Sequence, residues 1–334
     1  MARGALIGRD AVQPHPWESG AAPAETLLAA AESTTGEQDG HWLAAAWHAC
    51  GAFEWVTIGY LVWILALLGV CRRNIPHAAR SFAIHCALAA GIVAMAWMGA
   101  HSKNRAQQFA RHWYPLPLYI FFFEELQGLV HAIFPGWFDR WLISFDYNFA
   151  GVHPAAWLAG FATPALNDFM QFSYMTYFLF LVILPAILYV QNQRTAFWAV
   201  MASTAIAHYS VYVIAVLFPV ESPYFALASL HLAPLTGGAF TATIQFIERF
   251  GRVHGAAFPS AHVAGSMVAL LAARRYKPWL FWICLPLFLS MCVATVYGRY
   301  HYLADVLAGI AVGALGGALG QWILESKGAV PPLR

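Results

Sequence analysis

The chain has 334 residues, of which 60% are hydrophobic and only 10% are charged, and its formal net charge is +2. A soluble chain of this size carries roughly 25% charged residues, so there are too few charges here to cover a surface that faces water. This excludes an ordinary soluble domain and a disordered protein, and the weak net charge excludes a nucleic-acid binder. The composition is that of an integral membrane protein.

The N-terminal segment, residues 1–52, mixes Gly, Pro, Ala and acidic residues, and we expect it to be a loosely structured tail. Eight apolar runs follow, each suited to one transmembrane helix, for which about 20 residues are needed. Backbone exposed to lipid must bond internally, and the alternation of a barrel is absent, so helices are expected. Eight is the predicted count, with seven or nine as alternatives. The runs lie at 53–71, 82–100, 116–134, 171–191, 196–218, 260–274, 279–297 and 303–324.

Two connections between these runs are long. Residues 135–170 are rich in aromatic side chains and are expected to form interfacial or re-entrant structure. Residues 219–259 are rich in proline and glycine and are expected to form a loop, which is where a membrane enzyme would place its site. Five polar side chains of the first connection and the following helix could bind a head group, although capping and turns are the favoured interpretation. They are Asp139, Asp146, His153, Asn167 and Asp168.

The last apolar run has glycines four residues apart, at 309, 313 and 317 and at 316 and 320. Small residues at this spacing let a helix backbone approach a neighbouring helix closely. Basic residues favour the cytoplasmic side, and Arg274, Arg275 and Lys277 mark the turn after the sixth run as cytoplasmic. This orientation puts both long connections and the 298–302 turn outside, although the arginine-rich 72–81 loop violates it.

The first segment that contains candidate catalytic residues is Phe258-Pro259-Ser260-Ala261-His262. Proline and serine are typical of a helix start, where Ser260 would cap the first turn. The amides and the positive dipole end of a helix N-terminus suit a phosphate oxyanion, and His262 would lie in that first turn. The alternative is a capped helix with an interfacial histidine.

The second segment runs from Tyr297 to Asp305 and contains His301. His301 and Asp305 are four residues apart, so on a helix they would share one face. A carboxylate there would fix the imidazole tautomer and leave the other ring nitrogen as a nucleophile or base. The alternative is a structural pair that closes a helix end, but an ionisable group at the head of an apolar span is costly and argues against an idle role.

Together the two segments predict a phosphoryl-transfer site. Two antiparallel helices joined by a tight turn at 274–278 would bring both histidines to one membrane face. His301 would attack phosphorus, Asp305 would orient His301, and His262 would protonate the leaving oxygen. This scheme needs no metal and no cofactor.

These motifs resemble the type 2 phosphatidic acid phosphatase (PAP2) superfamily, whose second motif reads PSGH and whose third ends HxxxD. The loop 218–224 and the run 294–302 further resemble the branch that contains the inositol phosphorylceramide synthases. The resemblance covers about residues 115–324 and implies an all-α membrane protein with a six-helix catalytic core and its site at the outer, extracytoplasmic face. About two extra transmembrane helices would occupy 53–114, and residues 325–334 would form a C-terminal tail.

The chain departs from the family pattern in its cations. The first motif of the family usually supplies a lysine and an arginine, and residues 219–235 contain neither. The third motif often has an arginine where this chain has Thr295. We therefore expect Arg252 or Arg299 to bind the phosphate together with Ser260, the alternative being that both arginines are interfacial anchors. The loop residues expected to line the substrate site are Glu221, Ser222 and Tyr224.

Other polar and aromatic residues allow more than one interpretation. Glu124 and Glu125 lie in the third run, where intramembrane carboxylates are functional candidates but interfacial placement fits equally well. Tyr174 and Tyr177 are interpreted mainly as belt and packing residues.

The resemblance implies a membrane lipid-phosphate phosphatase or phosphotransferase that works through a phosphohistidine. The first alternative is an inositolphosphate or head-group transferase with a lipid hydroxyl as acceptor. The alternative from another class is a non-catalytic lipid-binding or transporter-like membrane protein. The expected partners are a lipid phosphate or phospholipid, the bilayer and a polar or lipid hydroxyl acceptor, with no nucleic acid.

Overall fold

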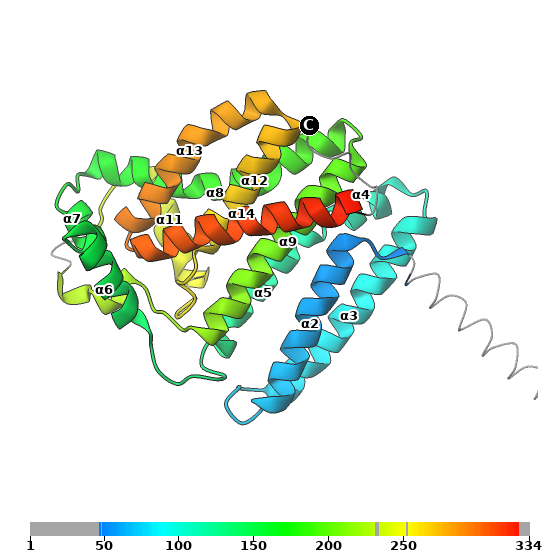
Figure 1. Cartoon of the computed structure of the whole chain (residues 1–334), viewed down its shortest axis with the longest axis horizontal. Helices are drawn as coiled ribbons and strands as arrows, with labels where there is room; N and C mark the ends of the chain where they lie inside the picture. Colours follow the sequence, from blue (N-terminus) through cyan, green and yellow to red (C-terminus); the bar gives the residue numbers. More distant parts are fainter. Residues whose placement is uncertain (1–46, 48, 231–233, 252, 327–334) are drawn as a thin grey trace, which may run out of the picture. The chain divides into compact units, whose positions relative to one another are not determined.

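A computed structural model describes residues 47, 49–230, 234–251 and 253–326. The described residues from Ala49 onward belong to one compact unit. Its described residues fold into helices, with one isolated bridge between Val220 and Ala256. The helices are α2 (Ala52–Val70), α3 (Ala78–His101), α4 (Arg105–Trp113), α5 (Pro115–Leu129), α6 (Asp139–Ala150), α7 (Pro154–Ala159), α8 (Pro164–Val190), α9 (Arg194–Leu217), α10 (Pro223–Ala226), η1 (Ala228–Leu230), α11 (Ala239–Gly251), α12 (Ala261–Tyr276), α13 (Pro278–Tyr297) and α14 (Leu303–Ser326) (Figure 1).

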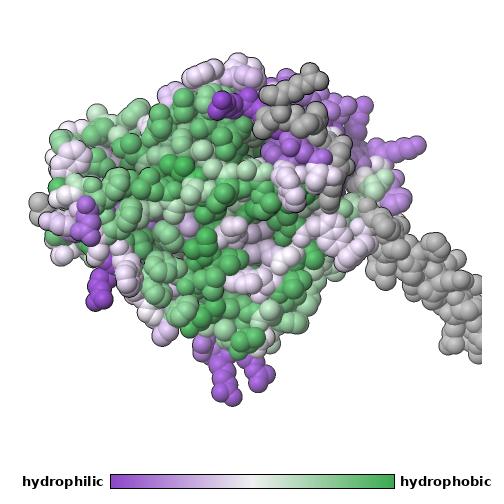
Figure 2. Space-filling model, viewed as in Figure 1, coloured by the Kyte–Doolittle hydropathy of each residue, from purple (hydrophilic) through white to green (hydrophobic). Residues whose placement is uncertain are grey.

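Six helices within the described part of the chain are long and apolar enough to cross a membrane: α2, α3, α8, α9, α13 and α14. Large apolar side chains such as Trp282 and Leu315, each 70% exposed, lie on their surfaces. Figure 2 shows hydrophobic residues over much of the displayed face and hydrophilic residues near its margins. An apolar surface of this extent belongs in hydrocarbon, and the chain is a multi-pass membrane protein.

The other two expected spans are helical but short. The helix α5 has 15 residues and α12 has 16, below the roughly 20 residues that a span requires. The prediction of eight full spans is therefore wrong for these two runs. Proline explains one boundary, because Pro115 starts α5. The other short helix is bounded by the Ser260 cap and by Lys277, which separates it from Pro278 of α13.

The two long connections contain more helix than expected. Residues 219–259 include the 13-residue helix α11, so the prediction of a loop throughout is wrong. Residues 135–170 contain α6, α7 and the start of α8. The helix α8 begins at Pro164 because Thr163 accepts a hydrogen bond from the amide of Leu166 and Pro164 fits the first helical position.

The glycines of α14 let it pack closely against two helices. A β-carbon on Gly309 would lie 2.8 Å from the carbonyl oxygen of Ser260, and one on Gly313 would overlap the carbonyl of Ala264 in α12. On the next face, a β-carbon on Gly316 would lie 3.0 Å from that of Ala207 in α9. The interpretation of the glycine spacing as helix packing is confirmed.

The N-terminal helices α2–α4 attach to the rest of this unit through buried polar contacts. Glu54 in α2 is fully buried and lies 2.7 Å from Arg111 Nη2 in α4, and the same Glu54 oxygen accepts a 2.7 Å hydrogen bond from the Tyr114 hydroxyl. The guanidinium of Arg111 lies 4.2 Å from the ring centroid of Trp198 in α9. A buried charge is stable only when it is paired in this way.

Candidate active site

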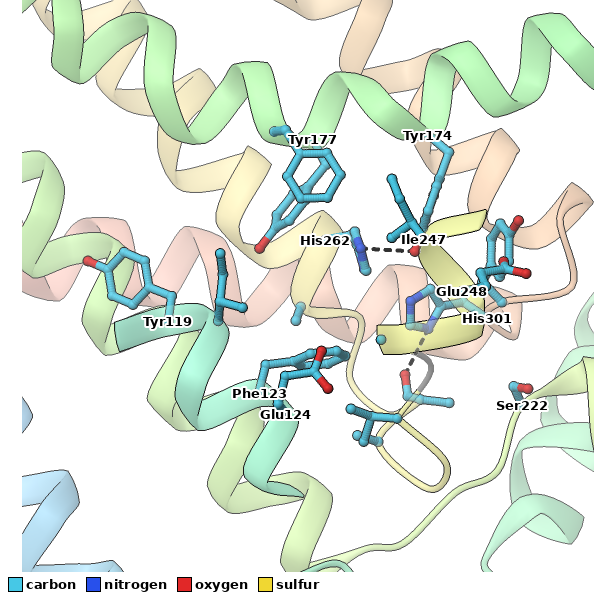
Figure 3. A pocket seen from close by; sticks show the side chains of 18 of the residues that line it. Tyr119, Phe123, Glu124, Tyr174, Tyr177, Ser222, Ile247, Glu248, His262 and His301 are labelled. Carbon is cyan, nitrogen blue, oxygen red and sulfur yellow. Dashed lines mark hydrogen bonds between the residues drawn. The ribbon is translucent and has the colours of Figure 1, made fainter. Parts of the chain in front are cut away.

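A cavity of about 310 Å³ lies among α5, α8, α11 and the segments that precede α12 and α14 (Figure 3). Both predicted catalytic histidines, His262 and His301, line it. Their ring centroids are 5.9 Å apart. The short connection through Lys277 makes α12 and α13 antiparallel neighbours, and the first turn of α12 therefore lies beside the segment that follows α13.

His262 lies in the first turn of α12, as its sequence context predicts. The hydroxyl of Ser260 accepts a 3.3 Å hydrogen bond from the amide of Val263, so Ser260 is the cap of this helix. His262 Nε2 lies 2.9 Å from the hydroxyl of Tyr174, and the ring of Tyr177 lies 4.4 Å from the His262 ring. These two tyrosines on α8 are therefore part of the cavity wall, and their interpretation as mainly belt residues was incomplete.

His301 has two acceptors at one ring nitrogen. Its Nδ1 donates to the carbonyl oxygen of Ala257 at 2.8 Å and lies 3.3 Å from Asp305 Oδ2. A proton on Nδ1 leaves Nε2 with a lone pair, the form needed for a nucleophile. The prediction that His301 and Asp305 share a helix face is wrong, because α14 begins at Leu303 and His301 precedes it.

Asp305 lies behind the cavity and does not line it. Its carboxylate is fully buried and Oδ2 accepts a 2.8 Å hydrogen bond from the amide of Tyr302. This bond shapes the turn into α14. The same carboxylate oxygen also contacts His301 Nδ1, at the longer distance of 3.3 Å.

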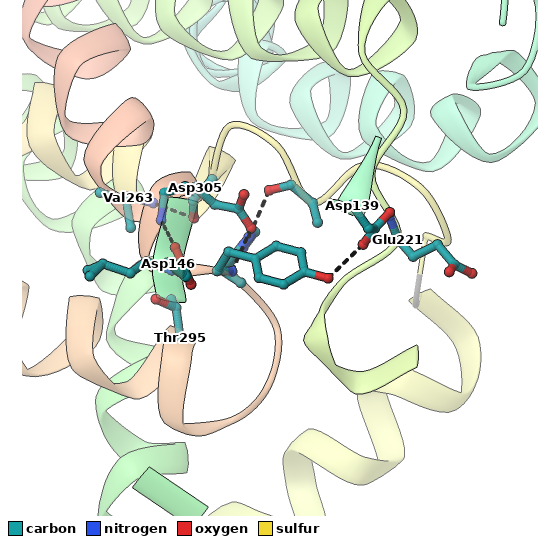
Figure 4. A network of polar contacts seen from close by, with 12 residues as sticks. Asp139, Asp146, Glu221, Val263, Thr295 and Asp305 are labelled. Atoms are coloured by element: carbon teal, nitrogen blue, oxygen red, sulfur yellow. Dashed lines mark hydrogen bonds and ion pairs between the residues drawn. The ribbon is translucent and has the colours of Figure 1, made fainter. Parts of the chain in front are cut away.

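Two carboxylates on α6 support the same segment (Figure 4). Asp139 accepts hydrogen bonds from the Tyr302 hydroxyl at 2.7 Å and from the amide of Glu221 at 2.9 Å. Asp146 accepts from the amides of Leu303 and Ala304, both at 2.9 Å, and so caps α14 from another helix. The preference for capping over head-group binding is supported at both positions.

The hydrogen bonds and burial act in opposite directions on these two acids. Burial raises the pKa of Asp139 above its ordinary value, and the bonds from Glu221 and Tyr302 oppose that rise. Burial likewise raises the pKa of Asp146, against the bonds from two backbone amides. Both carboxylates therefore have structural roles, since each already accepts hydrogen bonds from groups of the protein.

The loop residues Glu221, Ser222 and Tyr224 all line the cavity, as expected. Glu221 Oε1 lies 2.7 Å from His254 Nε2, and the amide of Tyr224 donates to the Arg299 carbonyl at 3.0 Å. The loop is thereby joined to the segments before α12 and before α14.

Of the two arginines expected to bind phosphate, Arg299 is absent from the described cavity wall. The described lining contains Glu124, Glu221 and Glu248 and neither lysine nor arginine. Arg299 is buried, with a left-handed φ of 66°, and does not line the cavity; burial lowers the pKa of its guanidinium. Arg252 lies outside the described residues.

Ser260 is also absent from the cavity wall, because it is completely buried as the cap of α12. Its hydroxyl accepts a hydrogen bond from the amide of Val263, and its carbonyl oxygen accepts one from the amide of Ala264. The first-turn amides of Ala261 and His262 lie at the positive end of the helix, beside the cavity. This helix terminus supplies positive potential at the two histidines.

The contacts of three residues at the site were not predicted from the sequence, and the reason can be given for each. The carbonyl of Ala257 has no side-chain signature, and its position depends on the paired backbone of Val220 and Ala257. Tyr174 reaches His262 from a helix 88 residues earlier in the chain. His254 pairs with Glu221 across a loop that contains no periodic pattern.

Residues 140–319 match the family model of the PAP2 superfamily, and the chain belongs to that superfamily. Membership makes it a phosphatase-type enzyme of the membrane, whether hydrolase or transferase. No significant match was found among curated proteins or among solved structures.

Proposed function

We propose that the protein is a lipid-phosphate phosphatase or phosphotransferase that forms a phosphohistidine on His301. The observation that carries the proposal is the pair of histidine rings, 5.9 Å apart, on one cavity wall at the N-terminus of α12. The hydrogen bond from His301 Nδ1 to Ala257 supports Nε2 as the nucleophilic atom.

In the first step the Nε2 lone pair of His301 attacks phosphorus while the phosphorus–oxygen bond to the leaving alcohol breaks. His262 gives its proton to that oxygen. In the second step His262 takes a proton from water as the water attacks phosphorus, and the phosphorus–nitrogen bond breaks. Each histidine returns to its starting state, so the cycle balances.

The second candidate differs only in the acceptor. If a lipid or polar hydroxyl replaces water in the second step, the enzyme is a head-group transferase, such as the inositolphosphate transferase that the loop 218–224 resembles. Three glutamates line the cavity and can accept hydrogen bonds from the hydroxyl groups of such an acceptor. The proposal also includes lateral entry of the lipid from the bilayer and a site on the extracytoplasmic face. Arg274 and Arg275 support this orientation, because they lie at the end of α12 opposite to the site and basic residues favour the cytoplasmic side.

The decisive variant is His301→Ala. We expect phosphate release from a diacylglycerol phosphate in detergent micelles to fall at least about 1,000-fold, because the nucleophile is removed. His101→Ala is the matched control, since His101 is exposed and lies outside the cavity.

The non-catalytic alternative predicts no turnover in the native protein, and unchanged turnover in a folded His301→Ala variant would contradict the mechanism. Addition of a lipid alcohol to a phospholipid donor separates the two enzymes, because a transferase makes a new phosphodiester and a hydrolase releases the phosphorylated head group.

A further inference from the structure

The cavity has an apolar arm that the chemistry at the histidines does not use. It extends between α5 and α8, and its wall there is formed by Ile120 and Phe123 from α5 and by Phe178, Leu181 and Val182 from α8. Figure 3 shows Tyr119 and Tyr177 on one side of the cavity and His301 on the other. One end is therefore polar and the other is lined by hydrocarbon.

Three tyrosines on this arm present their rings and not their hydroxyls. Tyr119 donates to the carbonyl of Met201 at 2.8 Å, and Tyr212 donates to the carbonyl of Tyr119 at 3.0 Å. The Tyr177 hydroxyl lies 2.9 Å from Nε2 of the buried His208. Since each hydroxyl already has a partner, the rings add an apolar surface to the cavity.

The arm opens on the side of the molecule. Ile120 is 59% exposed, Phe178 is 42% exposed and Val182 is 41% exposed, although all three line the cavity. Residues that are both lining and exposed lie at a mouth, and this mouth lies between α5 and the membrane-spanning helix α8. A mouth with apolar edges on such a helix meets the hydrocarbon of the bilayer.

We propose that this arm binds a hydrocarbon chain of the lipid whose phosphate lies between His262 and His301, and that α5 sets which chains fit. The inference rests on the proposed function for the identity of the polar end. The occupant is a chain of a membrane lipid because the arm is apolar, continuous with the histidines and open beside α8. The helix α5 (Pro115–Leu129) precedes the residues 140–319 that match the family model.

The test narrows the mouth from both sides. Ile120→Trp and Val182→Trp each place a larger ring where the chain would pass. Leu289→Trp is the control, because Leu289 is 56% exposed on the spanning helix α13 and does not line the cavity. The measured quantity is the ratio of kcat/KM for a long-chain diacylglycerol phosphate to that for its dihexanoyl counterpart.

We expect the ratio to fall at least tenfold in both mouth variants and to stay within twofold of the native value in Leu289→Trp. A ratio that stays unchanged in the mouth variants, or that falls equally in the control, overturns the inference. A ratio is used because it cancels any effect on the phosphate end that both substrates share.

A second measurement does not depend on turnover. A diacylglycerol phosphate with a diazirine in one chain is photolysed with the folded His301→Ala protein, and the labelled peptides are identified by mass spectrometry. Adducts on α5 and α8 support the site even if no substrate is turned over, in which case only the proposed function fails. Adducts confined to other helices overturn the hydrocarbon site even if the native enzyme is active.

Discussion

His301 owes its orientation to a backbone carbonyl as much as to a carboxylate. Its Nδ1 lies 2.8 Å from the oxygen of Ala257 but 3.3 Å from Asp305. A hydrogen bond at 3.3 Å with a nitrogen donor is beyond the usual range. The tautomer is therefore held mainly by the backbone, and Asp305 adds charge stabilisation and supports the turn.

The variant Asp305→Asn separates the contribution of the carboxylate from that of the Ala257 carbonyl. We expect kcat to fall about 10- to 100-fold, the range found when a partner that orients a metal-bound histidine is lost. The fall is smaller than in His301→Ala because the Ala257 carbonyl still accepts the Nδ1 proton. Steady-state kinetics of the two variants give the comparison, and equal losses would show that the carbonyl does not hold the tautomer.

At the scale of elements, α6 fixes the start of α14. Two amides of α14, from Leu303 and Ala304, have their acceptors on Asp146 and not within their own helix. Sequence reasoning identified Asp146 as a capping residue but could not identify which helix it caps, because the partner lies 157 positions later in the chain.

Removal of this cap has a predictable cost. Asp146→Ala should lower the free energy of unfolding by about 1–3 kcal/mol, since two amides lose their acceptor. Asp146→Asn keeps one acceptor oxygen and should lose less. Denaturation in mixed detergent micelles measures both, and a larger loss in the asparagine variant would contradict the capping role.

The contact between α14 and α12 offers a matched pair of glycines. Gly313→Ala would push a methyl group into the carbonyl of Ala264, whereas at Gly317 the nearest atom is a Leu271 methyl carbon 3.6 Å away. We expect Gly313→Ala to destabilise the protein by about 1–3 kcal/mol through overpacking. Gly317→Ala should leave stability unchanged or raise it by up to about 1 kcal/mol. Thermal denaturation in detergent checks the pair, and equal effects would exclude close packing as the reason for the spacing.

At the scale of the molecule, the buried Glu54–Arg111 pair joins α2 to α4, and Arg111 also contacts the Trp198 ring of α9. The two side chains are 1% and 10% exposed, so loss of either leaves a charge without its partner. We expect Glu54→Ala to cost about 3–5 kcal/mol of unfolding free energy. The double variant with Arg111→Ala should cost at least about 1 kcal/mol less than the sum of the single variants. Strict additivity in the denaturation experiment would show that the pair does not couple.

The sequence predicted most helices and both histidines that line the cavity, since these depend on local signals. Apolar runs about 20 residues long mark spans whatever they pack against. Pro259 and Ser260 mark a helix start because both act within one turn. The same locality explains the errors: α11 was interpreted as loop because glycine and proline dominate its flanks, and α5 was expected to extend to residue 134 but ends at Leu129.

By itself, the sequence determined that this is a membrane protein, that helices form it, and that PSAH and HxxxD belong to the PAP2 pattern. Hydropathy, caps and motif spacing are properties of short segments and can be read without neighbours. Only the tertiary structure decided that Ala257 holds His301, that Tyr174 contacts His262, that Arg299 is excluded from the described cavity wall and that α5 walls its apolar arm. These facts depend on contacts between segments distant in the chain, and such contacts follow from packing rather than from any local pattern.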